Sequence, residues 1–309
     1  MRKEPKYNKS ISWNLLLTFT GLVLFTTSFQ KVFAQEKPNP IKVLVVVAHP
    51  DDETSMAATI YKITHEQSGI VDQAIITNGE AGFKYSLLAQ DYYKIKLTNE
   101  KTGRENLPNI RKKEVQNAGK IIGIRNFYFF DQKDAHYGLD EREPLDTTWN
   151  VALVKSKLKE AMMLNKYDFV FCVLPENETH AHHKAATILA LETVTELETK
   201  PIILAVTTSK KTDTQQSNYS QLGNRNNTKI SNGFPAFKID RTTNFGFKDK
   251  LNYKIIVNWE IAEHKSQGTM QTYMNDGDYE NFWFFDVNLP QSLPKTKQFF
   301  DVLNSKTPQ

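Results

Sequence analysis

Five consecutive apolar residues, Val43 to Val47, run directly into the sequence Ala-His-Pro-Asp-Asp-Glu at residues 48–53. A short apolar run of this kind predicts a buried strand. The polar residues that follow then lie at the C-terminal end of that strand, where open α/β sheets bind their ligands. Pro50 fixes its own φ, which makes the turn stiffer than an ordinary loop. The sheet edge therefore carries a histidine and two adjacent carboxylates.

This group has the composition of an incomplete metal site. His49 and one carboxylate, from Asp51 or Asp52, supply two of the three protein ligands that a catalytic zinc site uses. A second histidine cluster, at residues 180–183, follows another apolar run, Phe169–Leu174, and can deliver the third. An aspartate that only caps the next helix is the alternative, but it explains neither histidine cluster. We expect Zn²⁺, with another first-row divalent metal as the alternative.

Strand-like and helix-like segments alternate from Ile41 onward. Strands are predicted at 42–47, 70–77, 126–130, 167–174, 201–206 and 253–257, and helices at 53–66, 108–122, 148–164, 180–197 and 259–273. Repeated βα units of this spacing predict a Rossmann-like α/β fold, with a mainly parallel sheet, helices on both faces and the metal site at the C-terminal strand ends. We expect one domain over residues 35–309.

The segments between these units differ in character. Residues 79–106 are polar and predict a long functional loop, with Pro108 opening the helix after it. Residues 208–235 are rich in Thr, Ser, Gln and Asn and predict a polar surface loop. The aromatic run at 282–285 is expected to pack in the core.

The first 34 residues are typical of a secretory signal peptide. A basic start precedes an uncharged, largely apolar stretch from Ser10 to Gln30, and the segment ends in Val-Phe-Ala34. We therefore expect an exported protein, periplasmic or extracellular, that is cleaved after Ala34. An uncleaved membrane anchor is the alternative, since a membrane span needs about 20 apolar residues.

The charge of the remaining chain excludes some partners. The chain has 39 Lys and Arg against 35 Asp and Glu, and the first 34 residues hold five of the former and one of the latter. The remainder is neutral, so no basic surface argues for nucleic acid or for an anionic membrane. Cys172 is the only cysteine, which leaves no internal disulfide.

Several segments resemble one family in the same order along the chain. Residues 48–53 resemble the signature of the LmbE/PIG-L-type zinc-dependent N-acetylglucosaminyl deacetylases. Further segments resemble other motifs of that family, at residues 77–82, 111–114, 129–134, 180–183, 262–267 and 280–282. The resemblance covers about residues 41–285.

The resemblance implies roles for individual residues. These are zinc ligands His49, Asp52 and His183, general base Asp51, electrophilic partner His180, and substrate contacts Arg111, Asp134 and Glu80. The family more often has Pro-Asp between its two histidines, where Ala181 and His182 stand here, so His182 competes for the ligand position. We choose His183, because its i, i+3 spacing places it on one helix face with His180. His264 is expected to serve in helix packing.

The combined prediction is an exported, metal-dependent hydrolase that removes the N-acetyl group from an N-acetylglucosamine-type amino sugar or glycoconjugate. One alternative is the same chemistry on a non-sugar or thiol-conjugate amide. Another is a non-catalytic carbohydrate-binding protein, which would have no use for Asp51. A nucleotide-binding Rossmann protein is excluded, because no Gly-x-Gly-x-x-Gly turn follows the first strand.

Overall fold

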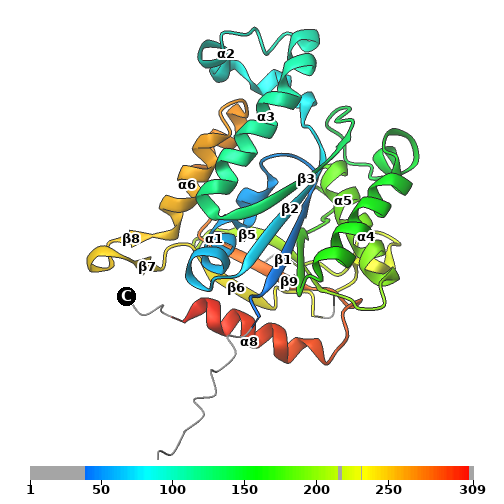
Figure 1. The fold of residues 1–309 in the computed structure, drawn as a ribbon, viewed down its shortest axis with the longest axis vertical. Helices are drawn as coiled ribbons and strands as arrows, with labels where there is room; N and C mark the ends of the chain where they lie inside the picture. Colours follow the sequence, from blue (N-terminus) through cyan, green and yellow to red (C-terminus); the bar gives the residue numbers. More distant parts are fainter. Residues whose placement is uncertain (1–38, 215–217, 231, 306–309) are drawn as a thin grey trace, which may run out of the picture. The chain divides into compact units, whose positions relative to one another are not determined.

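The structure, a computed structural model, describes residues 39–214, 218–230 and 232–305. Within them lies a seven-stranded sheet in the order β3–β2–β1–β4–β5–β9–β6 (Figure 1). Its strands are β1 Lys42–Val47, β2 Ile70–Thr77, β3 Ile124–Gln132, β4 Phe169–Val173, β5 Ile202–Ser209, β6 Phe237–Asp240 and β9 Tyr279–Phe284. The strands β1 to β5 are parallel and β9 is antiparallel to both neighbours. The predicted mainly parallel α/β fold is confirmed.

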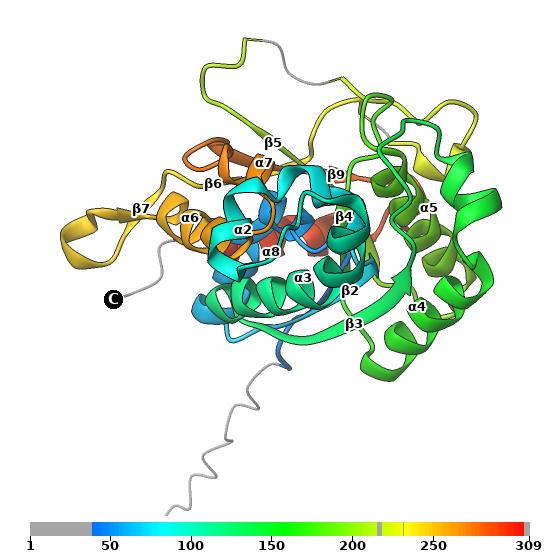
Figure 2. The same cartoon turned by 90° about the horizontal axis from the view of Figure 1, so that it is seen from above.

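Helices cover both faces of this sheet (Figure 2). They are α1 Ala57–Tyr61, α2 Leu87–Tyr93, α3 Glu100–Ile122, α4 Val151–Asn165, α5 Ala181–Glu196, α6 Tyr253–Glu263, α7 Gly268–Gln271 and α8 Ser292–Asn304. Helices α1, α3, α6 and α8 contribute to one apolar core, and α4 and α5 contribute to the other. A short hairpin, β7 Asn244–Phe245 and β8 Leu251–Asn252, lies outside the main sheet.

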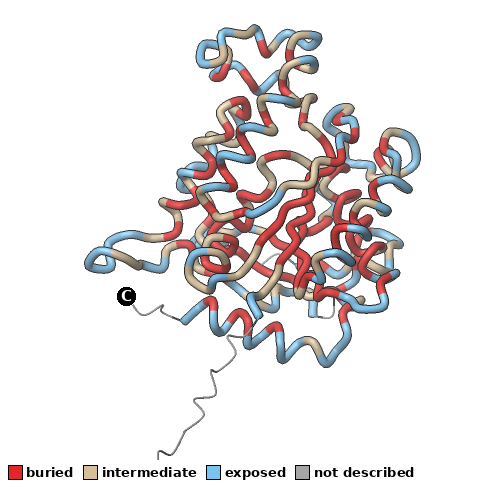
Figure 3. The backbone as a smooth tube through the Cα atoms, viewed as in Figure 1, coloured by how far each residue is buried: buried red, intermediate tan, exposed pale blue. Residues whose placement is uncertain are grey.

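The central strand β1 shows why its sequence is apolar throughout. Val43 and Val45 belong to the first core, whereas Leu44 and Val46 belong to the second. Successive side chains of a strand point to opposite faces, so a strand covered on both faces needs apolar residues at every position. The continuous buried stretch is visible at the centre of the molecule in Figure 3.

The strand order fixes where a ligand site belongs. From β1 the chain moves outward through β2 to β3, then returns to place β4 on the other side of β1. The two neighbours β1 and β4 therefore mark the point at which the strand order reverses. Ligands of open α/β sheets bind outside the carboxyl ends of the strands at this point.

Two predicted elements are wrong. Residues 79–106 are not a long loop, because they hold a 3-10 helix at Glu80–Tyr85, then α2, and α3 already begins at Glu100. The start of α3 is set by Asn99, whose side chain accepts a hydrogen bond from the Thr102 N–H. Pro108 lies inside α3 and does not open it.

Residues 253–257 were expected to form a strand, and they form the first part of α6 instead. The buried positions of α6 include Tyr253, Ile256, Val257 and Ile261, which lie on one helical face. Burial of that face against α1 and α3 outweighs the β propensity of the sequence Tyr-Lys-Ile-Ile-Val. The single helix predicted over 259–273 is accordingly replaced by the end of α6 and by α7.

The first two residues of the predicted polar loop at 208–235 still belong to β5, and the rest of the segment contains a short 3-10 helix at Asn226–Thr228. The predicted signal peptide at residues 1–34 lies outside the described residues. Among the described residues, no helix is both long and apolar enough to cross a membrane.

Candidate active site

The carboxyl ends of β1 and β4 bring the two histidine clusters together. His49 follows β1, and His180 is the residue that caps the N-terminus of α5, which follows β4. The His49 ring centroid lies between 5.0 and 5.4 Å from the ring centroids of His180, His182 and His183. The site is thus built by contacts between residues that lie more than 130 positions apart in the sequence. The strand order brings them together, because β1 and β4 are neighbours in the sheet.

Three side-chain atoms converge in the way that a metal ion needs. The Nδ1 of His49 lies 3.1 Å from the Nε2 of His183 and 3.6 Å from the Oδ1 of Asp52. The His183 Nε2 and the Asp52 Oδ1 are 3.0 Å apart. Zinc bonds of about 2.0–2.2 Å in a tetrahedron separate the ligand atoms by roughly 3.3–3.5 Å. His49, Asp52 and His183, called the ligand set below, therefore fit a zinc ion. The other carboxylate oxygen of Asp52 accepts hydrogen bonds from the backbone N–H groups of Ala48 and His49, at 3.0 and 2.8 Å.

His182 lies behind the ligand set and is buried. Its Nδ1 is 3.2 Å from the Nε2 of His49 and 3.3 Å from the Oδ1 of Asp134. Metal-binding histidines commonly use the second ring nitrogen in this way, which fixes the orientation of the ring. His182 therefore supports His49, and its position leaves the third ligand place to His183.

His180 lines the open side of the site and is also near enough to His49 and His183 to form an all-histidine group. Its ring is already occupied, since Nδ1 accepts from the His182 N–H at 3.3 Å and Nε2 lies 3.2 Å from the His136 carbonyl oxygen. Because a carbonyl only accepts, Nε2 carries the proton. Burial, followed by the charges of the other three histidines, lowers the pKa of His180 to about 3, so the ring is neutral near pH 7.

Asp51 occupies a strained backbone conformation next to the ligand set. Its φ is 151°, a value that residues with a Cβ rarely adopt and that costs about 1–3 kcal/mol. The turn brings two consecutive carboxylates to the same place, with Asp52 in the ligand set and Asp51 on the cleft wall. Burial raises the pKa of Asp51 to about 7, against the opposing charge of Arg111.

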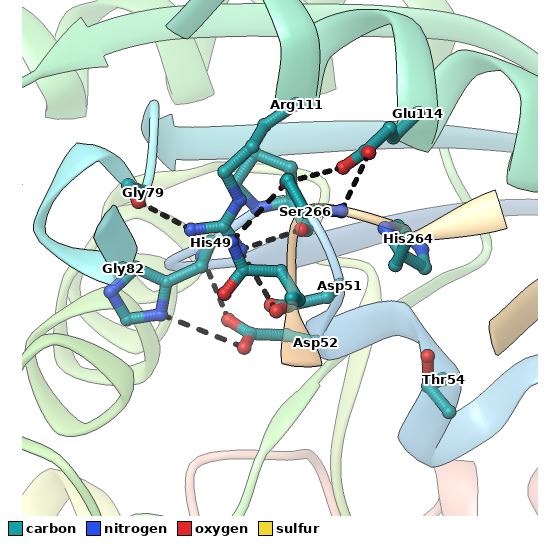
Figure 4. Close-up of polar contacts among 12 residues, drawn as sticks. His49, Asp51, Asp52, Thr54, Gly79, Gly82, Arg111, Glu114, His264 and Ser266 are labelled. Carbon is teal, nitrogen blue, oxygen red and sulfur yellow. Dashed lines mark hydrogen bonds and ion pairs between the residues drawn. The ribbon is translucent and has the colours of Figure 1, made fainter. Parts of the chain in front are cut away.

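Arg111 holds Asp51 from the other side (Figure 4). Its Nη2 donates to the Asp51 carboxylate at 2.8 Å and to the Pro50 carbonyl at 2.9 Å, and its Nη1 donates to the Gly79 carbonyl at 2.5 Å. The side chain is 3 % exposed. Arg111 was expected to contact the sugar, whereas its place in the structure is that of a buried clamp on the turn that carries Asp51.

The other two expected substrate contacts also face inward. Asp134 is 4 % exposed, accepts from the Ala81 N–H at 3.1 Å and touches His182. Glu80 accepts from the Asp134 N–H at 3.0 Å. Burial would raise the pKa of Asp134, but the hydrogen bond from His182 and the charge of His49 hold it well below its usual value. Asp134 therefore holds His182, Glu80 holds the backbone of Asp134, and neither carboxylate lines the cleft.

The helix motif that contains Arg111 is anchored by Glu114. Its carboxylate accepts from the Ser266 N–H at 2.7 Å and from the Ser266 hydroxyl at 2.6 Å (Figure 4). It also accepts from the Tyr93 hydroxyl at 2.7 Å. This bond network joins α3 to α2 and to the link between α6 and α7. The network fixes α3 in the position from which the Arg111 side chain reaches Asp51.

A cleft of about 600 Å³ opens in front of Asp51, Asp52, His180 and His183. Both apolar and polar side chains line it. The lining includes Val173, Leu174, Val206, Thr207, Thr208, Ser209, Lys210, Tyr137, Met270 and Tyr273. Sequence reasoning identified the catalytic end of this cleft and missed the wall, because the wall comes from β5, α7 and the loop before α5, which carry no motif of their own.

Comparison with known proteins agrees with this geometry. Residues 44–194 match the sequence model of the family described as PIG-L: GlcNAc-PI de-N-acetylase. The probable N-acetyl-alpha-D-glucosaminyl L-malate deacetylase 2 of Bacillus cereus is 26 % identical over 170 residues, which is 54 % of this chain and 68 % of that protein.

Two solved structures share the fold. The N,N'-diacetylchitobiose deacetylase of Pyrococcus horikoshii has a TM-score of 0.50 and 18 % identity, over 79 % of this chain and 83 % of its own. A 4-carboxy-2-hydroxymuconate hydratase from Pseudomonas putida also has a TM-score of 0.50, with 15 % identity, over 79 % and 95 %. The fold thus serves more than one reaction, and it is the sequence match that identifies residues 44–194 as a domain of the PIG-L (LmbE-like) N-acetylglucosamine deacetylase type.

Proposed function

We propose that this chain is an exported, metal-dependent deacetylase that hydrolyses the N-acetyl group of an N-acetylglucosamine-type amino sugar or glycoconjugate. The observation that carries the proposal is the place of Asp51, a carboxylate on the cleft wall that is bonded to Arg111 and stands beside the ligand set. A protein that only bound carbohydrate would have no use for a strained, buried carboxylate there. The names of the Bacillus cereus relative and the Pyrococcus horikoshii structure support an acetylated glucosamine as substrate.

His49, Asp52 and His183 would hold the metal ion. Zinc is the first candidate, because two imidazoles and one carboxylate with an open fourth position are typical of catalytic zinc sites. When bound, such an ion polarises the amide carbonyl and makes a water molecule more acidic.

Asp51 acts as the general base in this proposal. It takes a proton from the water that attacks the acetamide carbon, and a pKa near 7 suits a base that works at neutral pH. The carbon–nitrogen bond then breaks as the proton held by Asp51 passes to the nitrogen, which leaves as the free amine. Acetic acid is the second product and ionises to acetate. Arg111 keeps the Asp51 carboxylate oriented throughout.

His180 stabilises the oxyanion. Its neutral ring carries the proton on Nε2, which can exchange the His136 carbonyl for the negatively charged oxygen of the substrate. In the proposed complex the sugar lies along the cleft wall, where Tyr137, Thr207, Thr208 and Ser209 offer ring and hydroxyl contacts. Glu80, Arg111 and Asp134 support the site from behind.

The test is acetate release by the metal-loaded protein without residues 1–34. The panel contains N-acetylglucosamine, N-acetylglucosaminyl conjugates, N,N'-diacetylchitobiose, a thiol-conjugate amide and a simple N-acetylated alkylamine. We expect the acetylated sugars to be cleaved and the alkylamine to resist. Cleavage of the alkylamine or of the thiol conjugate at an equal rate would favour the general amidase, and no acetate from any compound would refute the deacetylase.

A further inference from the structure

A second cluster of ionisable side chains lies beneath the turn that carries Asp51. Glu53, Glu260 and His264 are fully buried, and the His264 Nε2 lies 3.0 Å from the Glu53 Oε1 and 3.1 Å from the Glu260 Oε1. We call these three residues the buried cluster. Sequence reasoning gave His264 only a packing role, and no step of the proposed reaction uses any of the three.

Stability alone does not explain the buried cluster. Removing two carboxylates and an imidazole from water is costly, and apolar side chains of similar volume are often no less stabilising in such places. Burial would lower the pKa of His264, but the carboxylates of Glu53 and Glu260 raise it well above its usual value. The ring is therefore charged, and it lies between two carboxyl groups, of which that of Glu260 has a pKa raised by burial.

Glu53 connects this buried cluster to Asp51. Its Oε2 accepts from the Asp51 backbone N–H at 3.1 Å and from the Gln73 Nε2 at 2.9 Å, while its Oε1 faces His264. One carboxylate thus links α6, β2 and the backbone of the strained residue. A conformation that costs free energy persists only where its surroundings hold it.

The turn between β1 and α1 is also held at Thr54, one residue after Glu53. The Thr54 hydroxyl donates to both carboxylate oxygens of Glu260, at 3.0 and 2.8 Å, and the Thr54 carbonyl accepts from the Arg241 Nη2 at 2.6 Å. His264 bridges Glu260 and Glu53. The turn between β1 and α1 is therefore supported by bonds from α6 at two consecutive residues.

We infer that Glu53, fixed by His264, is a positioning residue that keeps Asp51 at φ 151° and its carboxylate on the cleft wall. The inference rests on the proposed function insofar as Asp51 is the base. It assigns the buried cluster an effect on turnover and none on metal binding, because the Asp52 carboxylate is held separately by the Ala48 and His49 N–H groups.

Three variants separate positioning from stability. Glu53→Ala removes the side-chain acceptor of the Asp51 N–H and leaves the His49 carbonyl, at 3.1 Å. Glu53→Gln keeps an acceptor oxygen of the same reach. Asp72→Ala is the matched control, since it also deletes a fully buried carboxylate, one that pairs with Arg125 and Tyr167 near the start of β2. If Glu53→Ala does not fold, Glu53→Asp replaces it, because its shorter side chain cannot span both Asp51 and His264.

Crystal structures of the variants, solved without any substrate, measure the backbone conformation of Asp51. In Glu53→Ala we expect the Asp51 φ to leave the positive region and the bond to Arg111 to break, and in Glu53→Gln and Asp72→Ala we expect both features to remain. An unchanged Asp51 in Glu53→Ala, or in Glu53→Asp if that variant is used, would overturn the inference.

Kinetics give the second readout, at a temperature where every variant is folded. A displacement of about 1 Å costs about 10²-fold in rate, so Glu53→Ala should lower kcat by about that factor and leave KM and metal content unchanged. Glu53→Gln should recover part of the loss, and Asp72→Ala should keep the wild-type kcat. Equal losses of kcat in Glu53→Ala and Asp72→Ala would mean a structural role only. Wild-type protein that cleaves no amide would refute the deacetylase proposal, and the crystal structures would still decide the positioning.

Discussion

Replacing Gly79 with alanine tests whether Arg111 positions Asp51. Gly79 has a φ of 68°, and a Cβ built on it would lie 1.7 Å from the Arg111 Nη1. Real Cβ atoms come no closer than about 3.0 Å to such a neighbour, so the guanidinium must move by at least 1.3 Å. The hydrogen bond of 2.8 Å to the Asp51 carboxylate cannot survive a retreat of that size in its present geometry.

The expected cost has two parts. A residue with a Cβ in the left-handed region lowers the stability of the fold by about 1–2 kcal/mol. A hydrogen bond between charged groups contributes about 1.5–3 kcal/mol to that stability. The free energy of unfolding should therefore fall by roughly 2–5 kcal/mol in total. Activity should fall by about 10²-fold, because a catalytic group misplaced by about 1 Å loses that much.

Gly223→Ala is the control for the backbone part. Gly223 has a φ of 46°, and no atom of the described residues lies within 4 Å of a Cβ built there. It carries the cost of the left-handed conformation, about 1–2 kcal/mol, without any displaced neighbour. Urea unfolding gives the free energy for both variants, and acetate release gives kcat/KM. If both variants lose the same stability and both keep wild-type activity, Arg111 does not position Asp51.

Three further outcomes follow from the same site. Elemental analysis should find about one equivalent of metal in the wild-type protein, and His183→Ala should lose most of it, whereas His182→Ala should bind it about 10–100-fold more weakly; the reverse order would move the third ligand to His182. Asp51→Asn should keep its metal and lose about 10²–10⁴-fold in kcat, so full activity with full metal would exclude Asp51 as the base. N-terminal sequencing of the native protein should begin at Gln35, and an intact Met1 in a membrane fraction would favour the anchor.

The sheet was predictable because its strands are marked locally. The strand Lys42–Val47 and the strand Ile70–Thr77 coincide with β1 and β2 at both ends. The first is a short apolar run and the second is mostly apolar, with Asp72 and Gln73 inside it. Burial on two faces leaves few alternatives to a central strand for such segments. The aromatic run at 282–285 was predicted only as core, and it supplies the second half of strand β9 and the residue after it.

The two misplaced elements show where local sequence fails. Tyr253 to Val257 have strand propensity, and only the surfaces of α1 and α3 make a helical face at that place favourable. Pro108 is a common first residue of a helix, and here the Asn99 cap begins α3 a little more than two turns earlier. In the first case partners distant in sequence decided the conformation, and in the second case a local cap, Asn99 with the Thr102 N–H, set the start of the helix.

The sequence by itself determined which residue types gather at the sheet edge. His49 and Asp52 are three residues apart on one turn after β1, and residues 180–183 follow β4, the strand beside β1 in the sheet. The chain order and the sheet topology therefore bring these residues to the same edge of the sheet. Tertiary structure decided which way each of them faces. It placed His183 in the ligand set and His182 behind it, and it turned Arg111 and Asp134 away from the cleft. The physical reason is that these orientations depend on hydrogen bonds and burial between elements far apart in the chain, such as Arg111 with Gly79 and Asp51, and a single local sequence does not specify such contacts.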